Sequence, residues 1–310
     1  VENDRDRRMT IMTTTFIPCS AKLPIIGLLA GAMFDNSAWV GWSAYFLGIC
    51  AIVFSGIVLK KTKMFAGKPA PFVMELPAYH MPRPIDILKS VGERGMSFVK
   101  KAGTVILLAT ILVWFLSRFN FSLQYLPEED MDTSILAAFG NALAWLFAPL
   151  GWGKWKAVVA ALTGLIAKEN VVGTFGTLFH YAGSVDLKDD STAIWPQVKE
   201  YFASGVAGYS FLAFNLLCAP CFAAIGAIKR EMNNGRWTIF AIAWECFLAY
   251  CVSLVIYQVG GLVTGEVSFN PFTIVAFILI LAGLWGLFRP YKEAATLSGS
   301  EELAVEKAMA

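Results

Sequence analysis

Ionisable and amide side chains occur at a few positions inside otherwise apolar stretches of this sequence. Lys168, Glu169 and Asn170 are consecutive within KAVVAALTGLIAKENVVGTFGTLF. Glu245 lies in AIAWECFLAYCVSL, and Lys22 lies in PCSAKLP. In a membrane-spanning helix, a charged side chain near the bilayer centre costs about 2.5 to 3.5 kcal/mol, so it must face protein or water. Four such side chains together indicate a function inside the membrane.

On a continuous helix, Glu169 shares its face with small residues. The positions four, seven and eight residues later are Gly173, Gly176 and Thr177, and they lie on the same side of the helix. Such a face lets another helix approach closely, so we expect Glu169 to line an ion pathway, with Lys168 as its regulator or structural partner. The alternative is a structural ion pair between Lys168 and Glu169, although adjacent residues lie about 100° apart on a helix.

Two prolines interrupt the stretch that contains Lys22. Pro18 and Pro24 each remove a helical hydrogen bond, which predicts an interrupted helix with Cys19, Ser20 and Lys22 at the break. Unwound backbone at membrane depth is tolerated only where it is buried or lines a cavity, and transporters place coupling and substrate sites at such breaks. A helix that is merely kinked is the alternative.

A pair of cysteines flanks a proline in the stretch FNLLCAPCFAAIGAIKRE. The spacing of Cys218 and Cys221 places both thiols on one helical face, and Pro220 frees the carbonyl of Leu216 from its usual donor. Two thiols and one free carbonyl could therefore converge. A redox dithiol, half of a zinc site and buried inert cysteines are the alternatives. A closed zinc site is disfavoured because the chain has two histidines and no second cysteine pair at ligand spacing.

The chemistry of these groups narrows the candidate substrates. Thiol, carboxylate and free carbonyl together suit a divalent transition metal better than a sugar, an apolar drug or an alkali ion. Fe(II) binds such groups more weakly than Cu(II) or Zn(II), so a mixed and incomplete ligand set fits its passage. A transported ion must also leave, so we expect each ligand set to be transient.

Composition and hydropathy predict that membrane-spanning helices position these residues. Of the 310 residues, 57% are hydrophobic and 15% are charged, whereas soluble proteins carry about 25% charged residues. The net charge of +2, spread over short loops, disfavours nucleic-acid binding. A bilayer core about 30 Å thick needs about 20 apolar helical residues. The chain therefore reads as an all-α, polytopic helical membrane bundle with interrupted helices and about eight spans, at roughly 9–34, 37–59, 102–119, 134–152, 157–180, 206–228, 237–260 and 271–288.

The loops predict the orientation of this bundle. Counting eight spans puts every cluster of Lys and Arg on one side, which is the cytoplasmic side, together with both chain ends. The loop at 120–133 is acidic instead. In the loop at 60–101, a proline-rich part precedes IDILKSVGERGMSFVKK, whose spacing predicts a helix lying in the membrane interface. A coupling element that senses a cytoplasmic domain is the alternative reading of that helix.

Several long motifs resemble the membrane half of bacterial FeoB ferrous iron transporters. They are FIPCSAKLP, LTGLIAKENVVGT, LLCAPCFAAIGAIKRE followed by WECFLAY, and PFVMELPAYHMPRP before SFVKKAGTVIL. The resemblance covers about residues 5 to 290. It implies paired Gate repeats of the nucleoside-recognition type, whose cysteines are proposed to line the iron path. By matching motif, Cys218, Pro220 and Cys221 fall in the second Gate region, and Cys19 with Lys22 falls in the tail of the first.

This resemblance, with the residue chemistry, sets the expected organisation and sites. The expected regions are the tail of the first Gate region with a broken helix and one span (1–59), a cytoplasmic loop with an interfacial helix (60–101), two spans (102–152), the second Gate region (153–260), and a last span with a cytoplasmic tail (261–310). The candidate metal ligands are Cys19, Glu169, Cys218 and Cys221. The candidate pathway or gating residues are Ser20, Lys22, Lys168, Asn170, Pro220 and Glu245.

The function implied is a permease module, not an enzyme, that moves Fe(II) into the bacterial cytoplasm across the inner membrane. We expect no cofactor in this chain. In the family, an N-terminal GTPase domain binds GTP and Mg²⁺, and that domain, its spacer and the first Gate cysteine motif are expected to be missing upstream of RDRRMTIM. The expected partners are the lipid bilayer, the GTPase domain of the full-length protein, the small cytoplasmic proteins FeoA and FeoC, and further copies of the chain in a homo-oligomer.

Two other functions remain open from the residues alone. One is a membrane thiol oxidoreductase that uses Cys218 and Cys221. The other is a carrier of nucleosides or other small solutes that shares the Gate architecture. Measuring metal flux, nucleoside flux and thiol redox state separately distinguishes all three.

Overall fold

The computed structural model describes residues 4–35, 37–62, 64–65, 83–101, 104, 107–122, 124–127, 132–179, 195–202 and 204–289. Within these ranges helices dominate, and β pairing is limited to one isolated bridge between Phe119 and Tyr125. The predicted all-α fold is confirmed. The predictions for the proline-rich residues 66–82, the acidic residues 128–130 and the tail at 290–310 fall outside the described residues.

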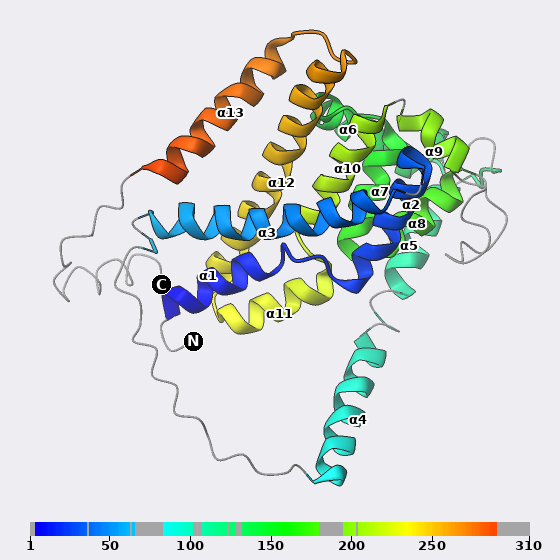
Figure 1. The fold of residues 1–310 in the computed structure, drawn as a ribbon. Helices are drawn as coiled ribbons and strands as arrows, with labels where there is room; N and C mark the ends of the chain where they lie inside the picture. Colours follow the sequence, from blue (N-terminus) through cyan, green and yellow to red (C-terminus); the bar gives the residue numbers. More distant parts are fainter. Residues whose placement is uncertain are drawn as a thin grey trace. The chain divides into compact units, whose positions relative to one another are not determined.

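The chain divides into two compact units, and the larger one comprises Val1–Lys68 and Ala137–Ala310. Its elements, shown in Figure 1, are α1 (Asp4–Thr14), the 3-10 turn η1 (Ser20–Lys22), α2 (Leu23–Phe34), α3 (Ala38–Lys60), most of α6 (Ile135–Phe147), the 3-10 turn η4 (Ala148–Leu150), α7 (Trp155–Ile166), α8 (Asn170–Leu178), α9 (Trp195–Phe202), α10 (Gly205–Leu217), α11 (Phe222–Met232), α12 (Gly235–Thr264) and α13 (Pro271–Phe288).

The smaller unit, Pro69–Leu136, contains α4 (Pro84–Lys101) and α5 (Leu107–Arg118). The helix α4 coincides with the predicted interfacial helix. Among its described side chains, the apolar ones are exposed, as an interfacial helix requires, and they include Ile85, Leu88, Val91, Met96 and Val99. The predicted helix is confirmed, and its contact with lipid stays a prediction.

Long apolar helices make this a multi-pass membrane protein. By length and composition, spans are formed by α3, by α10 with α11 counted as one, by α12 and by α13. A fifth span results if the pair α6–η4 and α7, bent by 97°, is counted as one. The described residues thus hold four or five such spans, where hydropathy predicted about eight. Hydropathy counts apolar residues but does not register breaks, and breaks divide the predicted segments 9–34 and 157–180, while 134–152 and 157–180 meet at the bend of 97°. Part of the predicted segment 102–119 lies outside the described residues.

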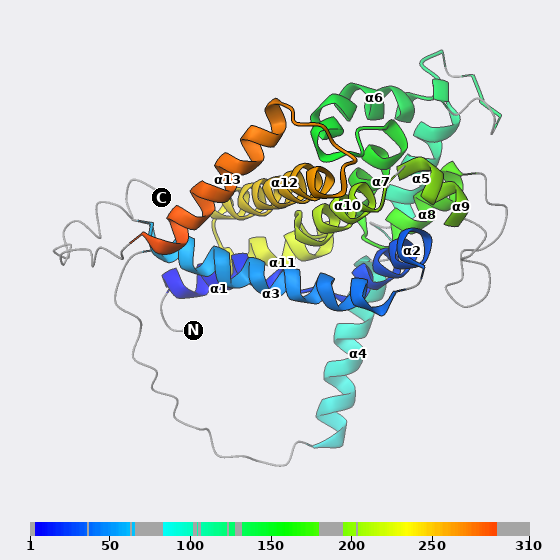
Figure 2. The same ribbon diagram turned by 45° about the horizontal axis from the view of Figure 1, so that its top comes forward.

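Local signals in the sequence fix the ends of the two longest C-terminal helices. The side chain of Asn234 accepts hydrogen bonds from the first backbone N–H groups of α12, and Gly265 ends that helix at φ 78°. Asn270 and Thr273 form a capping box at the start of α13, where Pro271 occupies the first turn. The two helices meet at this turn and splay apart away from it (Figures 1 and 2).

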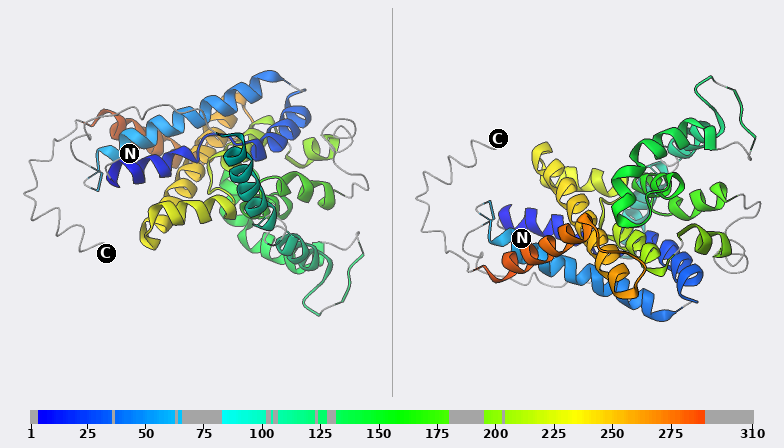
Figure 3. Two further views of the ribbon diagram at one scale, coloured as in Figure 1. Left: turned by 90° about the horizontal axis from the view of Figure 1, so that it is seen from below. Right: turned by 90° about the horizontal axis from the view of Figure 1, so that it is seen from above.

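The helix α10 packs along α12, and this pair supports the functional residues described below (Figure 2). At their contact, the hydroxyls of Ser210 and Ser253 lie 2.7 Å apart. The aromatic rings of Trp152, Phe175 and Phe211 fill the neighbouring core against α10. Elsewhere in the larger unit, α1 runs beside α3 (Figures 1 and 3). Small and hydroxyl-bearing residues let these helices approach closely, as membrane helix pairs generally do.

Candidate functional site

Three interruptions of the helical backbone carry the residues singled out by the sequence. The first break comprises residues 15–19, between α1 and η1. The second break comprises residues 167–169, between α7 and α8. The third break comprises residues 218–221, between α10 and α11. Each break leaves the last carbonyls of the preceding helix without their usual helical donors.

The interrupted helix predicted around Lys22 is confirmed. Cys19 is extended, with φ −86° and ψ 168°, and precedes the single turn of η1. The side chains of Cys19 and Ser20 are exposed, whereas that of Lys22 is only 2% exposed. Pro18 supplies no N–H donor and favours an extended residue before it, so the helix of α1 cannot continue through this point.

The continuous helix predicted through Lys168 and Glu169 is wrong. Ala167 is extended, with φ −149° and ψ 130°, and α8 begins only at Asn170. The break lets the two charged side chains take different surroundings: Lys168 is 2% exposed and Glu169 is exposed. Glu169 therefore does not share a helical face with Gly173, and no Lys168–Glu169 ion pair occurs in this part of the described chain.

The helical face predicted to carry both Cys218 and Cys221 is also wrong. Both residues are extended, with ψ values of 168° and 159°. Pro220 explains the difference, because it lacks a donor and restricts the backbone of the residue before it. The thiol of Cys218 is buried, and Cys221 is half-buried at the start of α11.

The carbonyl of Leu216, which Pro220 was predicted to free, receives a side-chain donor. Lys22 donates to this oxygen at 2.6 Å and also to the carbonyl oxygen of Thr15 at 3.1 Å. The ammonium group thus joins the first break to the carboxyl end of α10. A cation is favoured there because the helix dipole places about half a negative charge at a helix C-terminus.

The second break reaches the third through a thiol. The ammonium group of Lys168 donates to the sulfur of Cys218 at 3.0 Å. Gly164 lets the two segments pack closely at this point. A Cβ added there would lie 2.6 Å from a methyl group of Val171 and 3.9 Å from Cδ of Lys168. Lys168 therefore contacts the third break and not Glu169, whose regulator or structural partner it was predicted to be.

Glu245 joins α12 to the first break. Its side chain is fully buried, and Oε1 accepts a hydrogen bond of 2.6 Å from the hydroxyl of Thr15. The second carboxylate oxygen, Oε2, has no hydrogen-bond partner among the described residues. Glu245 therefore contacts another part of the bundle through Thr15.

These contacts gather the three breaks and α12 into one polar cluster. We call it the break cluster and define it by Thr15, Lys22, Lys168, Asn215, Leu216, Cys218 and Glu245. The C-termini of α1, α7 and α10 end beside it. Three helix dipoles therefore direct their negative ends toward the cluster, and such ends of discontinuous helices coordinate cations in transporters.

The predicted metal ligands do not form a metal site in this conformation. Among the described residues, no three Cys, His, Asp or Glu side chains lie close enough together to hold a metal ion. Cys218 is buried against Lys168, while Cys19 and Glu169 are exposed. Asn170 is half-buried at the start of α8. The ligand and gating roles of these residues stay predictions.

Sequence reasoning missed two members of the break cluster, Thr15 and Asn215. The amide of Asn215 is buried: Nδ2 donates to the carbonyl of Phe211 at 2.9 Å, and Oδ1 has no partner among the described residues. An asparagine inside the apolar run FNLLCAPC was a visible signal. A second signal is the pattern Pro-Cys-x-Ala, which occurs both at 18–21 and at 220–223.

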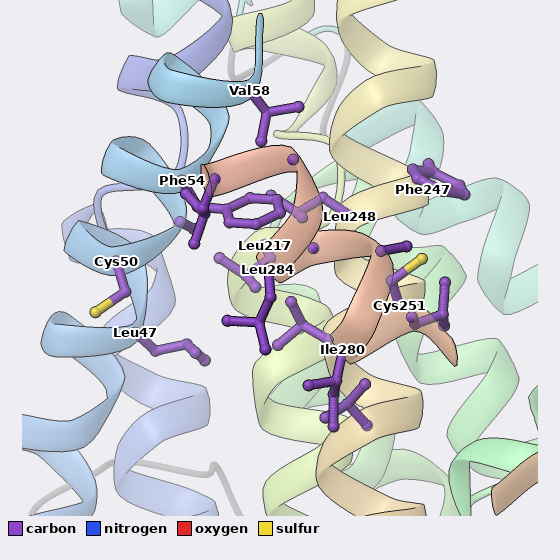
Figure 4. Close-up of a pocket in the computed structure, with 18 of the residues that line it drawn as sticks. Leu47, Cys50, Phe54, Val58, Leu217, Phe247, Leu248, Cys251, Ile280 and Leu284 are labelled. Atoms are coloured by element: carbon purple, nitrogen blue, oxygen red, sulfur yellow. The ribbon is translucent and has the colours of Figure 1, made fainter. Parts of the chain in front are cut away.

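An apolar groove of about 500 Å³ lies beside the cluster, between α3, α12 and α13 (Figure 4). Phe54, Leu248 and Ile280 line it from these three helices, and Leu217 reaches it from the end of α10. No charged side chain is among the lining residues. Apart from the thiols of Cys50 and Cys251 the lining is apolar, so the groove suits a hydrocarbon surface better than a hydrated cation.

Comparisons with known proteins identify two family regions. Residues 42–94 match the family described as "Ferrous iron transport protein B C terminus", and residues 99–235 match the Gate family, described as "Nucleoside recognition". The second and third breaks lie inside the Gate match. No solved structure matches the chain significantly.

Curated relatives extend the similarity over most of the chain. The Fe(2+) transporter FeoB of Methanocaldococcus jannaschii is 38% identical in an alignment of 269 positions that covers 84% of this chain and 38% of the relative. The Fe(2+) transporter FeoB of Escherichia coli strain K12 is 34% identical in an alignment of 332 positions, gaps included, that covers 92% of this chain and 42% of the relative.

A third relative is the "Fe(2+) transport protein A/Fe(2+) transporter FeoB fusion protein" of Porphyromonas gingivalis, 33% identical in an alignment of 300 positions that covers 84% of this chain and 35% of the relative. The chain thus spans about two fifths of the length of the relatives it matches. The two family matches and these relatives together show that the chain belongs to the FeoB family, as a segment of its C-terminal, Gate-containing part.

Proposed function

We propose that this chain is the membrane permease module of a ferrous iron transporter and that Fe(II) crosses at the break cluster. The observation that carries the proposal is the meeting of three interrupted helices around buried polar groups. Irregular backbone at membrane depth is stable only in such protected places, and it is there that transporters bind ions. The names of the relatives, Fe(2+) transporters, support iron as the ion.

The atoms of the cluster fit the chemistry of this ion. The thiol of Cys218, the carbonyl of Leu216 and the carboxylate of Glu245 form a mixed set of sulfur and oxygen donors. Such a set binds a borderline divalent metal without the strength of an all-thiolate cage, which would retain Cu or Zn. We propose that Cys19, Cys221 and Glu169, which are exposed or half-buried, meet the ion before or after it passes this point.

The wider setting of the module is part of the same proposal. Fe(II) moves into the cytoplasm across the inner membrane, with both ends of the chain cytoplasmic, and a GTPase domain of the full-length protein gates the path using GTP and Mg²⁺. The fusion of protein A with a FeoB transporter in one relative supports FeoA as a partner. FeoC and a homo-oligomer are further proposed partners, and α4 is a candidate contact for the cytoplasmic domain.

Iron flux through the intact protein tests the proposal. The protein is reconstituted in liposomes that contain a fluorescent iron chelator, and Fe(II) is added outside under anaerobic, reducing conditions. We expect Cys218→Ser to lower the initial rate by on the order of tenfold, equivalent to about 1.4 kcal/mol in the barrier. Cys50→Ser is the matched control, because Cys50 lines the apolar groove instead of the cluster. Normal flux in Cys218→Ser would remove this thiol from the path.

The same liposomes separate the alternative functions. The Gate family is described as "Nucleoside recognition". A nucleoside carrier would accumulate labelled nucleoside inside the liposomes regardless of Fe(II). A thiol oxidoreductase would change the redox state of Cys218 and Cys221, both free thiols here, while their replacement by Ser left iron flux intact. Nucleoside accumulation with no Fe(II) flux above protein-free liposomes would replace the transporter proposal, and intact flux in the Ser variants would remove the two thiols from the iron path.

A further inference from the structure

Two buried ammonium groups occupy the atoms that a passing metal ion needs. Lys22 holds the carbonyl oxygen of Leu216 at 2.6 Å, and Lys168 holds the sulfur of Cys218 at 3.0 Å. Both lysines are 2% exposed, and they lie within electrostatic range of each other. A metal ion and an ammonium group of the same charge sign cannot share these lone pairs, because each repels the other at contact distance.

Two oxygens of the cluster are left without any donor in the same conformation. Oε2 of Glu245 and Oδ1 of Asn215 are buried, and neither has a hydrogen-bond partner among the described residues. Asn215 lies beside the second break, since a Cβ added at Gly164 would be 3.5 Å from its Oδ1 and 3.9 Å from Cδ of Lys168. Buried oxygens without donors raise the free energy of a fold unless something binds them. These two oxygens are therefore available as ligands for a cation.

We propose that Lys22 and Lys168 are built-in cations that close the iron path by occupying its ligand atoms, and that Fe(II) passes when it displaces them. This inference rests on the proposed function and adds its regulation. Lys22 belongs to the single turn of η1, and Lys168 belongs to an extended break. Each ammonium group can therefore leave by a change of rotamer or of local backbone, without unwinding a helix. The four-carbon lysine stem has the freedom for that movement.

Displacement of the lysines also explains how binding of Fe(II) at the break cluster affects the rest of the bundle. Each lysine joins a break to another element: Lys22, in η1, ties Thr15 of the first break to Leu216 of α10, and Lys168 ties the second break to Cys218 of the third. When Fe(II) takes Leu216 and Cys218 as ligands, both ties are lost together. The same event that seats the ion therefore releases the helices on either side of it.

Binding of Co(II) to the intact, detergent-solubilised protein tests this inference directly. Co(II) stands in for Fe(II), and its bond to a thiolate gives a charge-transfer absorption band that reports on Cys218. We expect Lys168→Met, which removes the charge at similar side-chain length, to raise the apparent Co(II) affinity by about tenfold to a hundredfold, the equivalent of a charge-assisted hydrogen bond. Adding Cys218→Ser to that variant should abolish both the gain and the band.

Three further variants make the result specific. Lys168→Arg keeps the cation, so its affinity should stay near that of the unaltered protein. Lys22→Met repeats the test at the carbonyl of Leu216 and should also raise the affinity. Lys156→Met is the matched control, because Lys156 likewise donates to a backbone carbonyl, that of Leu178 at 3.1 Å, but lies outside the break cluster. It should leave Co(II) binding unchanged.

Opposite outcomes would overturn the inference. If folded Lys168→Met and Lys22→Met bind Co(II) no better than the unaltered protein, the lysines do not compete with the ion. If both variants fail to fold, the ammonium groups are structural and cannot be displaced in each transport event. Iron flux keeps the two proposals apart: absence of flux in the unaltered protein rejects the proposed function, whereas normal flux with unchanged Co(II) affinity in the variants rejects the lysine mechanism alone.

Discussion

Thr15 and Glu245 are 230 positions apart in the sequence, and a hydrogen bond of 2.6 Å joins their side chains. This bond fixes the first break against α12, because Glu245 is fully buried at that contact. The hydroxyl donates to Oε1, which leaves Oε2 available to a cation or to another hydrogen-bond donor. One side chain thus serves both the packing of the bundle and the electrostatics of the break cluster.

Removing the hydroxyl at this contact should destabilise the protein. Thr15→Val keeps the shape but leaves the carboxylate of Glu245 without its donor, and an unsatisfied buried charge costs at least about 1 to 3 kcal/mol. We expect a lower temperature of unfolding in detergent, measured by intrinsic Trp fluorescence. Thr15→Ser retains the hydroxyl and serves as the control, so equal destabilisation by Ser and Val would show that the methyl group, not the hydrogen bond, matters.

Changing the exposed carboxylate of the second break should separate transport from stability. Glu169→Gln removes a charge from an exposed side chain, and such surface substitutions usually change stability by less than about 0.5 kcal/mol. We expect the protein to remain folded and the Fe(II) flux in liposomes to fall. Normal flux accompanied by weaker folding would instead show a structural role for Glu169.

The turn between η4 and α7 depends on a glycine for two separable reasons. Gly151 has φ 88°, and an added Cβ would lie 2.1 Å from the ring of Tyr257. Gly265 has a similar φ of 78°, but no atom lies within 4 Å of an added Cβ. Gly265→Ala should therefore show only the backbone cost, of order 1 kcal/mol. Gly151→Ala should lose clearly more in thermal unfolding, and equal losses would mean that the ring of Tyr257 moves aside freely.

Proline marked two of the three breaks in the sequence, although the helical face predicted for Cys218 and Cys221 ignored the effect of Pro220 on the backbone. Pro18 and Pro24 predicted the first break, and Pro220 predicted the free carbonyl of Leu216. The second break escaped prediction because no proline or glycine adjoins Lys168 and the apolar pattern continues through it. Its cause is tertiary: Lys168 reaches the sulfur of Cys218, a contact fifty residues away that propensity and periodicity do not encode.

The candidate site was likewise predicted only in part. Residue types alone selected Lys22, Lys168, Cys218 and Glu245, because charge and sulfur in apolar stretches demand an explanation. The pairing among them depends on which helix ends meet, and a single sequence does not specify this. Charged neighbours in sequence suggested a Lys168–Glu169 pair, but the extended backbone at Ala167 sends the two side chains into different surroundings.

The uninterrupted course of α12 has a consequence for how the bundle can move. This helix runs for 30 residues, or about 45 Å at 1.5 Å per residue, and it carries Glu245 on a rigid rod. Every other member of the break cluster belongs to an interrupted segment or adjoins one. A rearrangement confined to the interruptions leaves Glu245 in place, so this carboxylate keeps its position while the other groups of the break cluster move.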